Sequence, residues 1–317
     1  MILDIFFIVI GLVMLVLGAE GFVKGASVVA KKLRVSELAI GLTVVAFGTS
    51  TPDLVVNSFA SFQGNSDLVF GNVLGSNNFN LFMILGIAGL ITPMVVQSST
   101  AWREIPISFA AALLVFILVN DGITGFETSN ALGYADAIIL AVCFIGFLYY
   151  VKRQLKSEPG GKAEEIRMLS TSRTILFIVL GLAGLVIGGR LVVDYAVALA
   201  TGLGVSEKVI GLTIVAAGTS LPELATSVIA AIRKNNDIAV GNIIGSNVFN
   251  LLLILSVSAF VQPLNYNPSF NTDLYLLGGG TLLLFIGMWT GGRKKLDRWE
   301  AVLLLVTFVI YTVVLLG

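Results

Sequence analysis

Long apolar stretches alternate with short polar connections along most of the chain. A bilayer core about 30 Å thick needs roughly 20 apolar residues per helix. By this measure the sequence predicts ten membrane-spanning helices. Their expected limits are residues 3–30, 36–61, 68–91, 104–119, 132–151, 173–200, 207–231, 238–261, 271–290 and 297–316. The hydrophobic pattern therefore predicts an all-α polytopic membrane protein.

The composition agrees with this pattern and narrows the chemistry. Of the 317 residues, 56% are hydrophobic and only 12% are charged, which is too apolar for a protein whose surface faces water. The single cysteine, Cys143, excludes a disulfide within the monomer, and the absence of histidine excludes imidazole ligands. The first apolar run has no basic leader and no cleavage site, so we interpret it as a spanning helix rather than a signal peptide. Carboxylates remain as the main candidates for cation or proton chemistry.

One unusual motif interrupts two of the predicted helices. The stretches "VAFGTSTPDLVV" (Val45–Val56) and "VAAGTSLPELAT" (Val215–Thr226) lie 170 positions apart. Between residues 11–80 and 181–250, aligned at this offset, 33 of 70 positions are identical. Many of the identities are glycine-led triplets, which shared hydrophobicity does not explain. The sequence therefore contains an internal duplication.

The distribution of basic residues predicts how the two copies are oriented. With the N-terminus outside, 16 of the 19 Lys and Arg fall in cytoplasmic connections, as the positive-inside rule requires. Equivalent loops exchange their charge, because Lys31 and Lys32 align with neutral residues whereas Arg233 and Lys234 align with Gln63 and Gly64. Five spans per half require such an exchange. We therefore expect two inverted-topology five-helix repeats, an architecture typical of secondary transporters. The expected boundaries are a first repeat at 1–151, a cytoplasmic linker at 152–172 and a second repeat at 173–317.

Each interrupted helix carries one acid beside its break. Proline removes a backbone donor, so the motifs predict freed carbonyls next to Asp53 and Glu223. A charge at that depth costs several kcal/mol and indicates a functional site, although a neutral acid that joins two helices is the simpler alternative. The neighbouring hydroxyl residues are Thr49, Ser50, Thr219 and Ser220. Together these groups predict an all-oxygen shell, which suits a hard cation such as Ca²⁺ with its 6–8 oxygen ligands.

The next span of each half supplies further polar groups. In "GNVLGSNNFN" (Gly71–Asn80) the side chains of Asn72, Ser76 and Asn80 recur every four residues, which places them on one helix face. The second copy, "GNIIGSNVFN", repeats them as Asn242, Ser246 and Asn250. Hydrogen bonding between helices is the alternative role for the asparagines. We expect four polar-lined helices to surround one site.

At these motifs the chain resembles the cation/calcium exchanger superfamily, and within it the prokaryotic sodium/calcium exchangers with two alpha repeats. The resemblance covers the whole chain. It implies that Ca²⁺ and Na⁺ are the transported ligands, and it implies a set of ion ligands in this sequence. That set comprises Asp53, Glu223, Thr49, Thr219, Ser50, Ser220, Ser76, Ser246, the carbonyls of Ala46 and Ala216, and Asn80 and Asn250 on the partner helices. Two positions depart from the family pattern, which usually has glutamate at position 53 and often aspartate at position 250.

The expected function is secondary-active antiport of Ca²⁺ against Na⁺ by alternating access, with calcium export as the expected direction. A Ca²⁺/H⁺ antiporter on the same scaffold is the first alternative, because the two carboxylates can carry protons. A cation channel is a more distant alternative, since a pore does not need two inverted halves. No ATP-binding loop or nucleophile constellation is present, so we expect neither enzymatic activity nor a cofactor. The expected location is the inner or plasma membrane, with no nucleic-acid or protein partner.

Two further charge pairs lie on the first helix of each half. Glu20 with Lys24, and Arg190 with Asp194 at the matching positions, have the i, i+4 spacing of ion pairs on one helix face. We expect both pairs to be structural.

Overall fold

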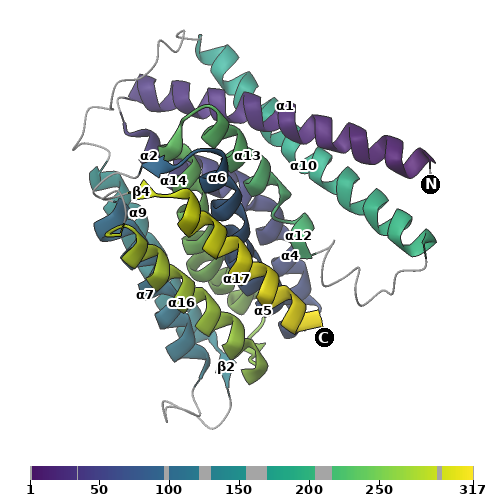
Figure 1. Cartoon of the computed structure of the whole chain (residues 1–317). Coiled ribbons are helices and arrows are strands. Elements are labelled where there is room, and N and C mark those ends of the chain that lie inside the picture. The colour runs from purple at the N-terminus through teal and green to yellow at the C-terminus, as the bar shows by residue number, and fades with distance from the viewer. Residues whose placement is uncertain are drawn as a thin grey trace.

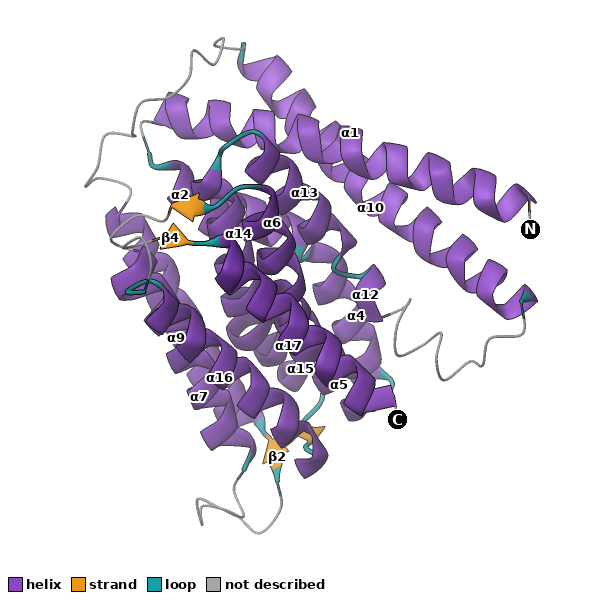
Figure 2. Cartoon of the chain, in the orientation of Figure 1, coloured by secondary structure: helices purple, strands orange, loops and turns teal. Residues whose placement is uncertain are grey.

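The structure is a computed structural model that describes residues 2–33, 35–95, 100–120, 130–154, 170–203, 216–290 and 295–316. Nearly all of these residues are helical (Figure 2). Two long helices, α1 (Ile2–Leu33) and α10 (Thr171–Gly202), lie side by side along one flank of a bundle formed by the other helices (Figure 1). The molecule therefore has two parts, a long-helix pair and a bundle.

The bundle draws on both halves of the chain. The first half contributes α2 (Glu37–Ile40), η1 (Gly41–Val45), α3 (Ala46–Thr49), α4 (Thr51–Phe62), α5 (Ser66–Asn78), η2 (Phe79–Ile84), α6 (Leu85–Ile91), η3 (Thr100–Glu104), α7 (Ile105–Val119) and α9 (Tyr134–Gln154). The second half contributes α12 (Ala216–Gly218), α13 (Leu221–Ile232), α14 (Asn236–Val248), η5 (Phe249–Ile254), α15 (Leu255–Val261), η6 (Pro268–Phe270), α16 (Asn271–Gly287) and α17 (Arg298–Leu316).

Two short antiparallel ladders connect the halves. Strand β1 (Met94–Val95) pairs with β4 (Lys295–Leu296), and β2 (Ala131–Leu132) pairs with β3 (Leu264–Asn265). Each ladder joins one strand of the first half to one of the second. The two halves of the chain are thus interleaved in the bundle rather than folded as separate lobes.

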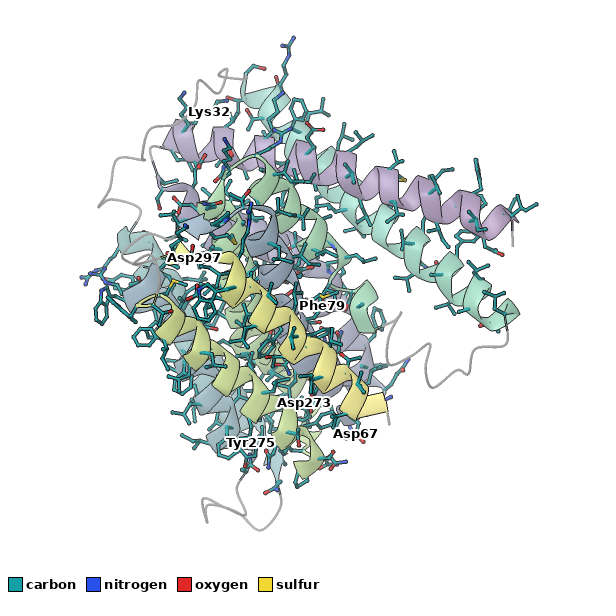
Figure 3. The ribbon with its side chains drawn as sticks, viewed as in Figure 1. Lys32, Asp67, Phe79, Asp273, Tyr275 and Asp297 are labelled. Atoms are coloured by element: carbon teal, nitrogen blue, oxygen red, sulfur yellow. The ribbon has the colours of Figure 1, made fainter. Side chains whose placement is uncertain are left out.

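The spans agree in part with the sequence prediction. Among the described residues, eight helices are long and apolar enough to cross a membrane. A ninth span is the pair Glu37–Thr49 and Thr51–Phe62, which is bent by 48°. The predicted span 207–231 is represented by the apolar helix Leu221–Ile232, and its residues 207–215 lie outside the described part of the chain. Figure 3 shows the labelled Lys32 and Asp297 toward one end of the bundle, and Asp67 and Tyr275 toward the other.

Glycines hold the two long helices together. A Cβ placed on Gly18 would lie 2.8 Å from the carbonyl oxygen of Gly181, and one placed on Gly188 would lie 2.7 Å from that of Gly11. Backbones that approach so closely leave no room for side chains and gain dispersion energy along the interface. The pair α1–α10 is therefore a single tightly packed unit.

The turns that follow the broken helices have matching geometry in both halves. Gly64 between α4 and α5 has φ 75°, and Lys234 at the equivalent place between α13 and α14 has φ 58°. In both turns the following asparagine, Asn65 or Asn235, caps the next helix by accepting from a backbone N–H three residues on. Equivalent backbone conformations at positions 170 residues apart support the duplication seen in the sequence.

Candidate cation-binding site

Two helix breaks bring the predicted acids to the centre of the bundle. Helix α3 ends at Thr49 and α4 begins at Thr51, whereas α12 and α13 are separated by the turn at Thr219 and Ser220. Asp53 and Glu223 lie in the first turns of α4 and α13, and they are only 2% and 1% exposed. The N-terminus of a helix carries partial positive charge, which favours a carboxylate there. Each break therefore provides a helix end that stabilises a buried acid.

Hydrogen bonds cross between the halves at the broken segments. The hydroxyl of Thr49 donates to Oδ1 of Asn242 over 3.1 Å, and the equivalent hydroxyl of Thr219 donates to Oδ1 of Asn72 over 3.2 Å. Each broken helix is thus tied to the asparagine-bearing helix of the opposite half. Asn72 and Asn242 take the interhelical role that was the alternative to ion binding.

The two acids differ in how they are held. Ser50 donates to Oε1 of Glu223 over 2.9 Å. No equivalent bond joins Ser220 to Asp53. Oγ of Ser220 and Oδ1 of Asp53 are both buried, and neither has a hydrogen-bond partner. Aspartate is one methylene shorter than glutamate, so its carboxylate reaches less far. Asp53 instead faces Thr219, Ser76 and Asn72.

The helices that carry the asparagines are not α-helical throughout. Helix α5 passes into the π-helical segment η2 at Phe79, and α14 passes into η5 at Phe249. The four-residue spacing holds for Ser76, which donates to Oδ1 of Asn72 over 3.1 Å. Asn80 and Asn250 lie in the wider turns of the π segments, which are frequent at functional sites, so their place on that face stays a prediction.

Several oxygens of the predicted site lack a hydrogen-bond partner although they are buried. They are Oδ1 of Asp53, Oε2 of Glu223, Oγ of Ser220, Oγ of Ser246, Oδ1 of Asn80 and Oδ1 of Asn250. A buried polar atom without a hydrogen-bond partner is costly, so these oxygens are candidates for binding an ion. All of these atoms are oxygen acceptors or hydroxyls, and the set includes two carboxylates. Such a set fits a hard cation.

The predicted carbonyl ligands have different outcomes. The carbonyl of Ala46 is not freed by the break, because it accepts from the N–H of Ser50 at 3.0 Å. In the second half the N–H of Ser220 donates to the carbonyl of Ala217 at 3.2 Å. The bond equivalent to that of Ser50 would instead end at the carbonyl of Ala216. Ala216 is the first residue of α12. The π-helical segment η1 directly precedes Ala46 and loosens the helix on that side.

Glycines on α14 set the distance between the site helices. A Cβ on Gly241 would lie 2.8 Å from the carbonyl oxygen of Leu38, and one on Gly245 would lie 2.7 Å from the Cβ of Ala46. These contacts press α14 against the segment from α2 to α3. The neighbouring Asn242 thereby reaches the break at Thr49.

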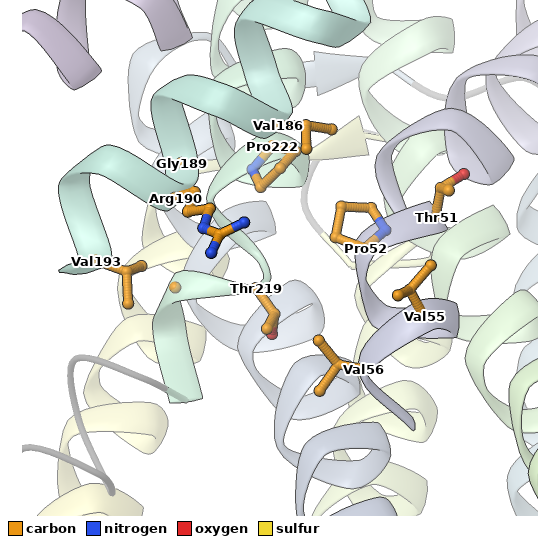
Figure 4. A pocket seen from close by; sticks show the side chains of 11 residues that line it. Thr51, Pro52, Val55, Val56, Val186, Gly189, Arg190, Val193, Thr219 and Pro222 are labelled. Atoms are coloured by element: carbon orange, nitrogen blue, oxygen red, sulfur yellow. The ribbon is translucent and has the colours of Figure 1, made fainter. Parts of the chain in front are cut away.

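A cavity of about 420 Å³ separates the long helix α10 from the broken helix α4 (Figure 4). Its lining reaches Pro52, Thr219 and Pro222, which are adjacent in sequence to site residues or belong to the site. Arg190 of α10 projects beside it in Figure 4. The other lining residues are Thr51, Val55, Val56, Val186, Gly189, Val193 and Gly218. The cavity is therefore largely apolar, with Arg190 in its lining, and it borders residues next to the two acids in sequence.

The opposite end of the long-helix pair is closed by polar contacts. Glu20 of α1 forms an ion pair with Arg233, which caps α13, and Ser27 accepts a hydrogen bond of 3.1 Å from Nδ2 of Asn235. The predicted pairing of Glu20 with Lys24 is wrong, since Lys24 lies 4.9 Å from the ring centre of Phe177. Arg190 and Asp194 do form the predicted pair, at 3.5 Å.

Sequence reasoning missed the asparagine cluster between the halves. Asn77 and Asn247 exchange hydrogen bonds with each other's backbone and accept from Asn250 and Asn80. Their signal was available, because both stand in the "GSN" triplet that is identical in the two copies. Asn57 and Ser227, also at equivalent positions, were missed as well, and they bond to the Asp53 carbonyl and to Asn242.

Comparisons with known proteins agree with this geometry. Residues 3–153 and 173–317 match the family described as "Sodium/calcium exchanger protein". The chain is 37% identical over 314 residues to the "Putative antiporter CaxA" of Alkalimonas amylolytica, covering 96% of each chain. It is 34% identical over 346 residues to the "Sodium/calcium exchanger MaX1" of Methanosarcina acetivorans, covering 97% of each.

Solved structures give the same result. The sodium-calcium exchanger NCX_Mj, soaked with 2.5 mM Na⁺ and 1 mM Sr²⁺, superposes with a TM-score of 0.84 at 29% identity, covering 98% of each chain. The fold is that of an integral membrane transporter for cations, not of an enzyme. Together, the buried oxygen site, the two broken helices and these matches show that the chain belongs to the sodium/calcium exchanger family.

Proposed function

We propose that this protein exchanges Ca²⁺ for Na⁺ across a membrane by alternating access, in the direction of calcium export. The observation that carries the proposal is the set of unpartnered buried oxygens around Asp53 and Glu223. Two ionised carboxylates neutralise one Ca²⁺, whereas an empty site leaves two negative charges in a low dielectric. This difference opposes movement of the empty carrier and couples the two ion fluxes.

The proposed ligands are the residues that the family motif selects. They are Asp53, Glu223, Thr49, Thr219, Ser50, Ser220, Ser76, Ser246, Asn80, Asn250 and the carbonyls of Ala46 and Ala216. The crossing bonds of the two threonines and of Ser50 support a site built jointly by both halves. A hydroxyl that donates its hydrogen in one of these bonds can still coordinate a cation through its oxygen, so the bonds can persist when the ion binds.

The proposed topology has ten spans in two inverted repeats, residues 1–151 and 173–317, joined by a cytoplasmic linker at 152–172. The matching turns at Gly64 and Lys234 support the repeat. In this topology the N-terminus is outside, and the cavity at Arg190 opens to the outside. The ion pair of Glu20 with Arg233 then lies toward the cytoplasmic end, and this supports the proposal of an outward-open form.

Sodium is the proposed coupling ion. The departure at Asn250 supports it, because an amide cannot release a proton as an aspartate can. The experiment is calcium uptake into proteoliposomes that contain the purified protein and are loaded with Na⁺, or that carry only a proton gradient. We expect uptake that requires outward Na⁺ and does not respond to the proton gradient alone. The reverse pattern would replace the proposal with Ca²⁺/H⁺ antiport, and uncoupled flux in both conditions would indicate a channel.

The topology is tested separately. In a background without Cys143, single cysteines at Gly64 and at Lys234 should react with an impermeant maleimide from opposite sides of the membrane. Labelling of both from one side would contradict the inverted arrangement.

A further inference from the structure

Four asparagines meet where the two halves of the bundle cross. Asn77 donates its Nδ2 to the backbone oxygen of Asn247, and Asn247 donates its Nδ2 to the backbone oxygen of Asn77, both over 3.3 Å. Nδ2 of Asn80 donates to Oδ1 of Asn247 over 3.1 Å, and Nδ2 of Asn250 donates to Oδ1 of Asn77 over 3.0 Å. All four side chains are at most 2% exposed. We refer to these four residues as the asparagine clasp.

The hydrogen bonds of the clasp fix which atom of each side-chain amide is the oxygen and which is the nitrogen. A backbone carbonyl accepts hydrogen bonds and cannot donate, so the amide nitrogen of Asn77 must face the Asn247 carbonyl. Its side-chain oxygen then faces Asn250 and can bond only to the nitrogen of that amide. The oxygen of Asn250 is consequently left without a partner. The same sequence of constraints runs from Asn247 to Asn80.

The alternative orientation is unfavourable at each step. If the amide of Asn80 were reversed, its oxygen would oppose Oδ1 of Asn247 at hydrogen-bond distance, and two acceptors in a dry interior repel each other. The nitrogen, instead of the oxygen, would then be the atom without a partner. The clasp therefore holds the nitrogens of Asn80 and Asn250 in its hydrogen bonds and leaves their oxygens free.

We propose that Asn77 and Asn247 are positioning residues, which hold Asn80 and Asn250 with their side-chain oxygens directed to the transported cation. The inference rests on the proposed function, since it takes Asn80 and Asn250 as ion ligands. Each positioning residue acts on the opposite half, because Asn247 orients Asn80 and Asn77 orients Asn250. A ligand whose orientation is fixed before the ion arrives loses less entropy on binding.

The test compares Asn247→Leu with Asn78→Leu in the purified protein. Asn78 is a matched control, because it is also fully buried and its Nδ2 also donates to a backbone carbonyl, that of Asp273, over 3.2 Å. It has no contact with the clasp among the hydrogen bonds of the described residues. Calorimetric titration with Ca²⁺ gives the dissociation constant, and sodium-driven uptake gives the apparent KM and the maximal rate.

Asn247→Leu should weaken Ca²⁺ binding about tenfold or more, the range found when groups that orient metal ligands are removed. The apparent KM should rise by the same factor, with the maximal rate within about twofold of the unmodified protein. Asn78→Leu should lower thermal stability to a similar extent but leave the dissociation constant within about twofold. Equal Ca²⁺ affinities for the two variants would overturn the inference.

A double-variant comparison separates the inference from the proposed function. If Asn247 acts through Asn80, then Asn80→Ala with Asn247→Leu should bind Ca²⁺ as weakly as Asn80→Ala alone, whereas Asn250→Ala with Asn247→Leu should show additive losses. Normal Ca²⁺ affinity in Asn80→Ala and Asn250→Ala would overturn the ligand assignment and the inference together. Weak binding in those variants, combined with additive losses for Asn80 and Asn247, would overturn the inference alone. If Asn247→Leu is not recovered folded, Asn77→Leu makes the same test with Asn250 in place of Asn80.

Discussion

The two halves of the molecule carry almost the same motif but hold their acids differently. In one, Glu223 receives a hydrogen bond of 2.9 Å from Ser50. At the equivalent place, Asp53 receives no hydrogen bond from Ser220. A single methylene thus makes a duplicated site chemically asymmetric. Glu223 accepts a hydrogen bond from Ser50 of the opposite half, whereas Asp53 faces Thr219 of the opposite half together with Ser76 and Asn72 of its own.

The ends of the long-helix pair show a second asymmetry. Position 20 on α1 is an acid that pairs with Arg233, and the equivalent position on α10 is Arg190, which lies beside a cavity. The equivalent of Arg233 is Gln63, which carries no charge. The matching turns are therefore preserved, whereas the charges at equivalent positions differ. An ion pair equivalent to that of Glu20 with Arg233 cannot form between Arg190 and Gln63.

The largest expected effect comes from removing either acid. Asp53→Asn and Glu223→Gln should each reduce sodium-driven calcium uptake at least a hundredfold, because the site then lacks one of the charges that compensate Ca²⁺. Both variants should be extracted and elute as the unmodified protein does in size-exclusion chromatography. Normal uptake by one variant would show that only one half contributes an essential acid, and normal uptake by both would remove the site.

The next largest effect is expected from cross-linking the contact between α1 and the turn after α13. Ser27→Cys with Asn235→Cys, in a background without Cys143, places two thiols where a 3.1 Å hydrogen bond now joins the side chains. Oxidation should reduce uptake about tenfold or more, and reduction should restore it, because alternating access requires this contact to open. The control is Val197→Cys with Asn65→Cys at the equivalent positions, which should cross-link more slowly. Full transport by the oxidised Ser27–Asn235 pair would contradict the movement.

A smaller effect follows from exchanging the acids. Asp53→Glu should allow the missing bond from Ser220 and raise the Ca²⁺ affinity about threefold. Glu223→Asp should lose the bond from Ser50 and lower the affinity about tenfold, in line with hydrogen bonds to charged groups worth about 1.5–3 kcal/mol. Titration calorimetry measures both. A loss of affinity in Asp53→Glu would contradict this prediction and show that the shorter side chain of aspartate suits the site better.

The smallest effect is expected at the ion pair. Glu20 and Arg233 are 50% and 36% exposed, and pairs of this kind contribute little after screening by solvent. Glu20→Gln or Arg233→Gln should change the uptake rate by no more than about threefold, and less at high salt. The exchange Glu20→Arg with Arg233→Glu should restore the original rate. Arg190→Gln, whose partner Asp194 is on the same helix, is the control for a general charge effect.

Much of the fold and of the site follows from local sequence. The spans, the two breaks and the buried acids could be predicted because membrane depth makes proline, glycine and carboxylates costly wherever they lack a role. Ser76 was placed correctly by helical spacing, and the crossing role of Asn72 and Asn242 was among the alternatives.

Other features depend on tertiary contacts that spacing does not specify. Glu20 lies within reach of Lys24 on its own helix, yet Arg233, 213 positions away, takes its carboxylate. The widening of the helices at Phe79 and Phe249, just before Asn80 and Asn250, is another feature that four-residue spacing does not indicate. The orientation of Asn77 and Asn247 is set by a backbone carbonyl in the other half, which no pattern along one helix indicates.

The paired π-helical segments also indicate whether the π turn arose before or after the duplication of the two halves. A π turn is equivalent to one residue inserted into an α-helix, and the segments at 79–84 and 249–254 occupy positions exactly 170 residues apart. Two independent insertions at the same place are a less economical history than one. The simplest genealogy has the insertion in a single ancestral half, before gene duplication. On that account the wider turn beside the asparagine is older than the duplication itself.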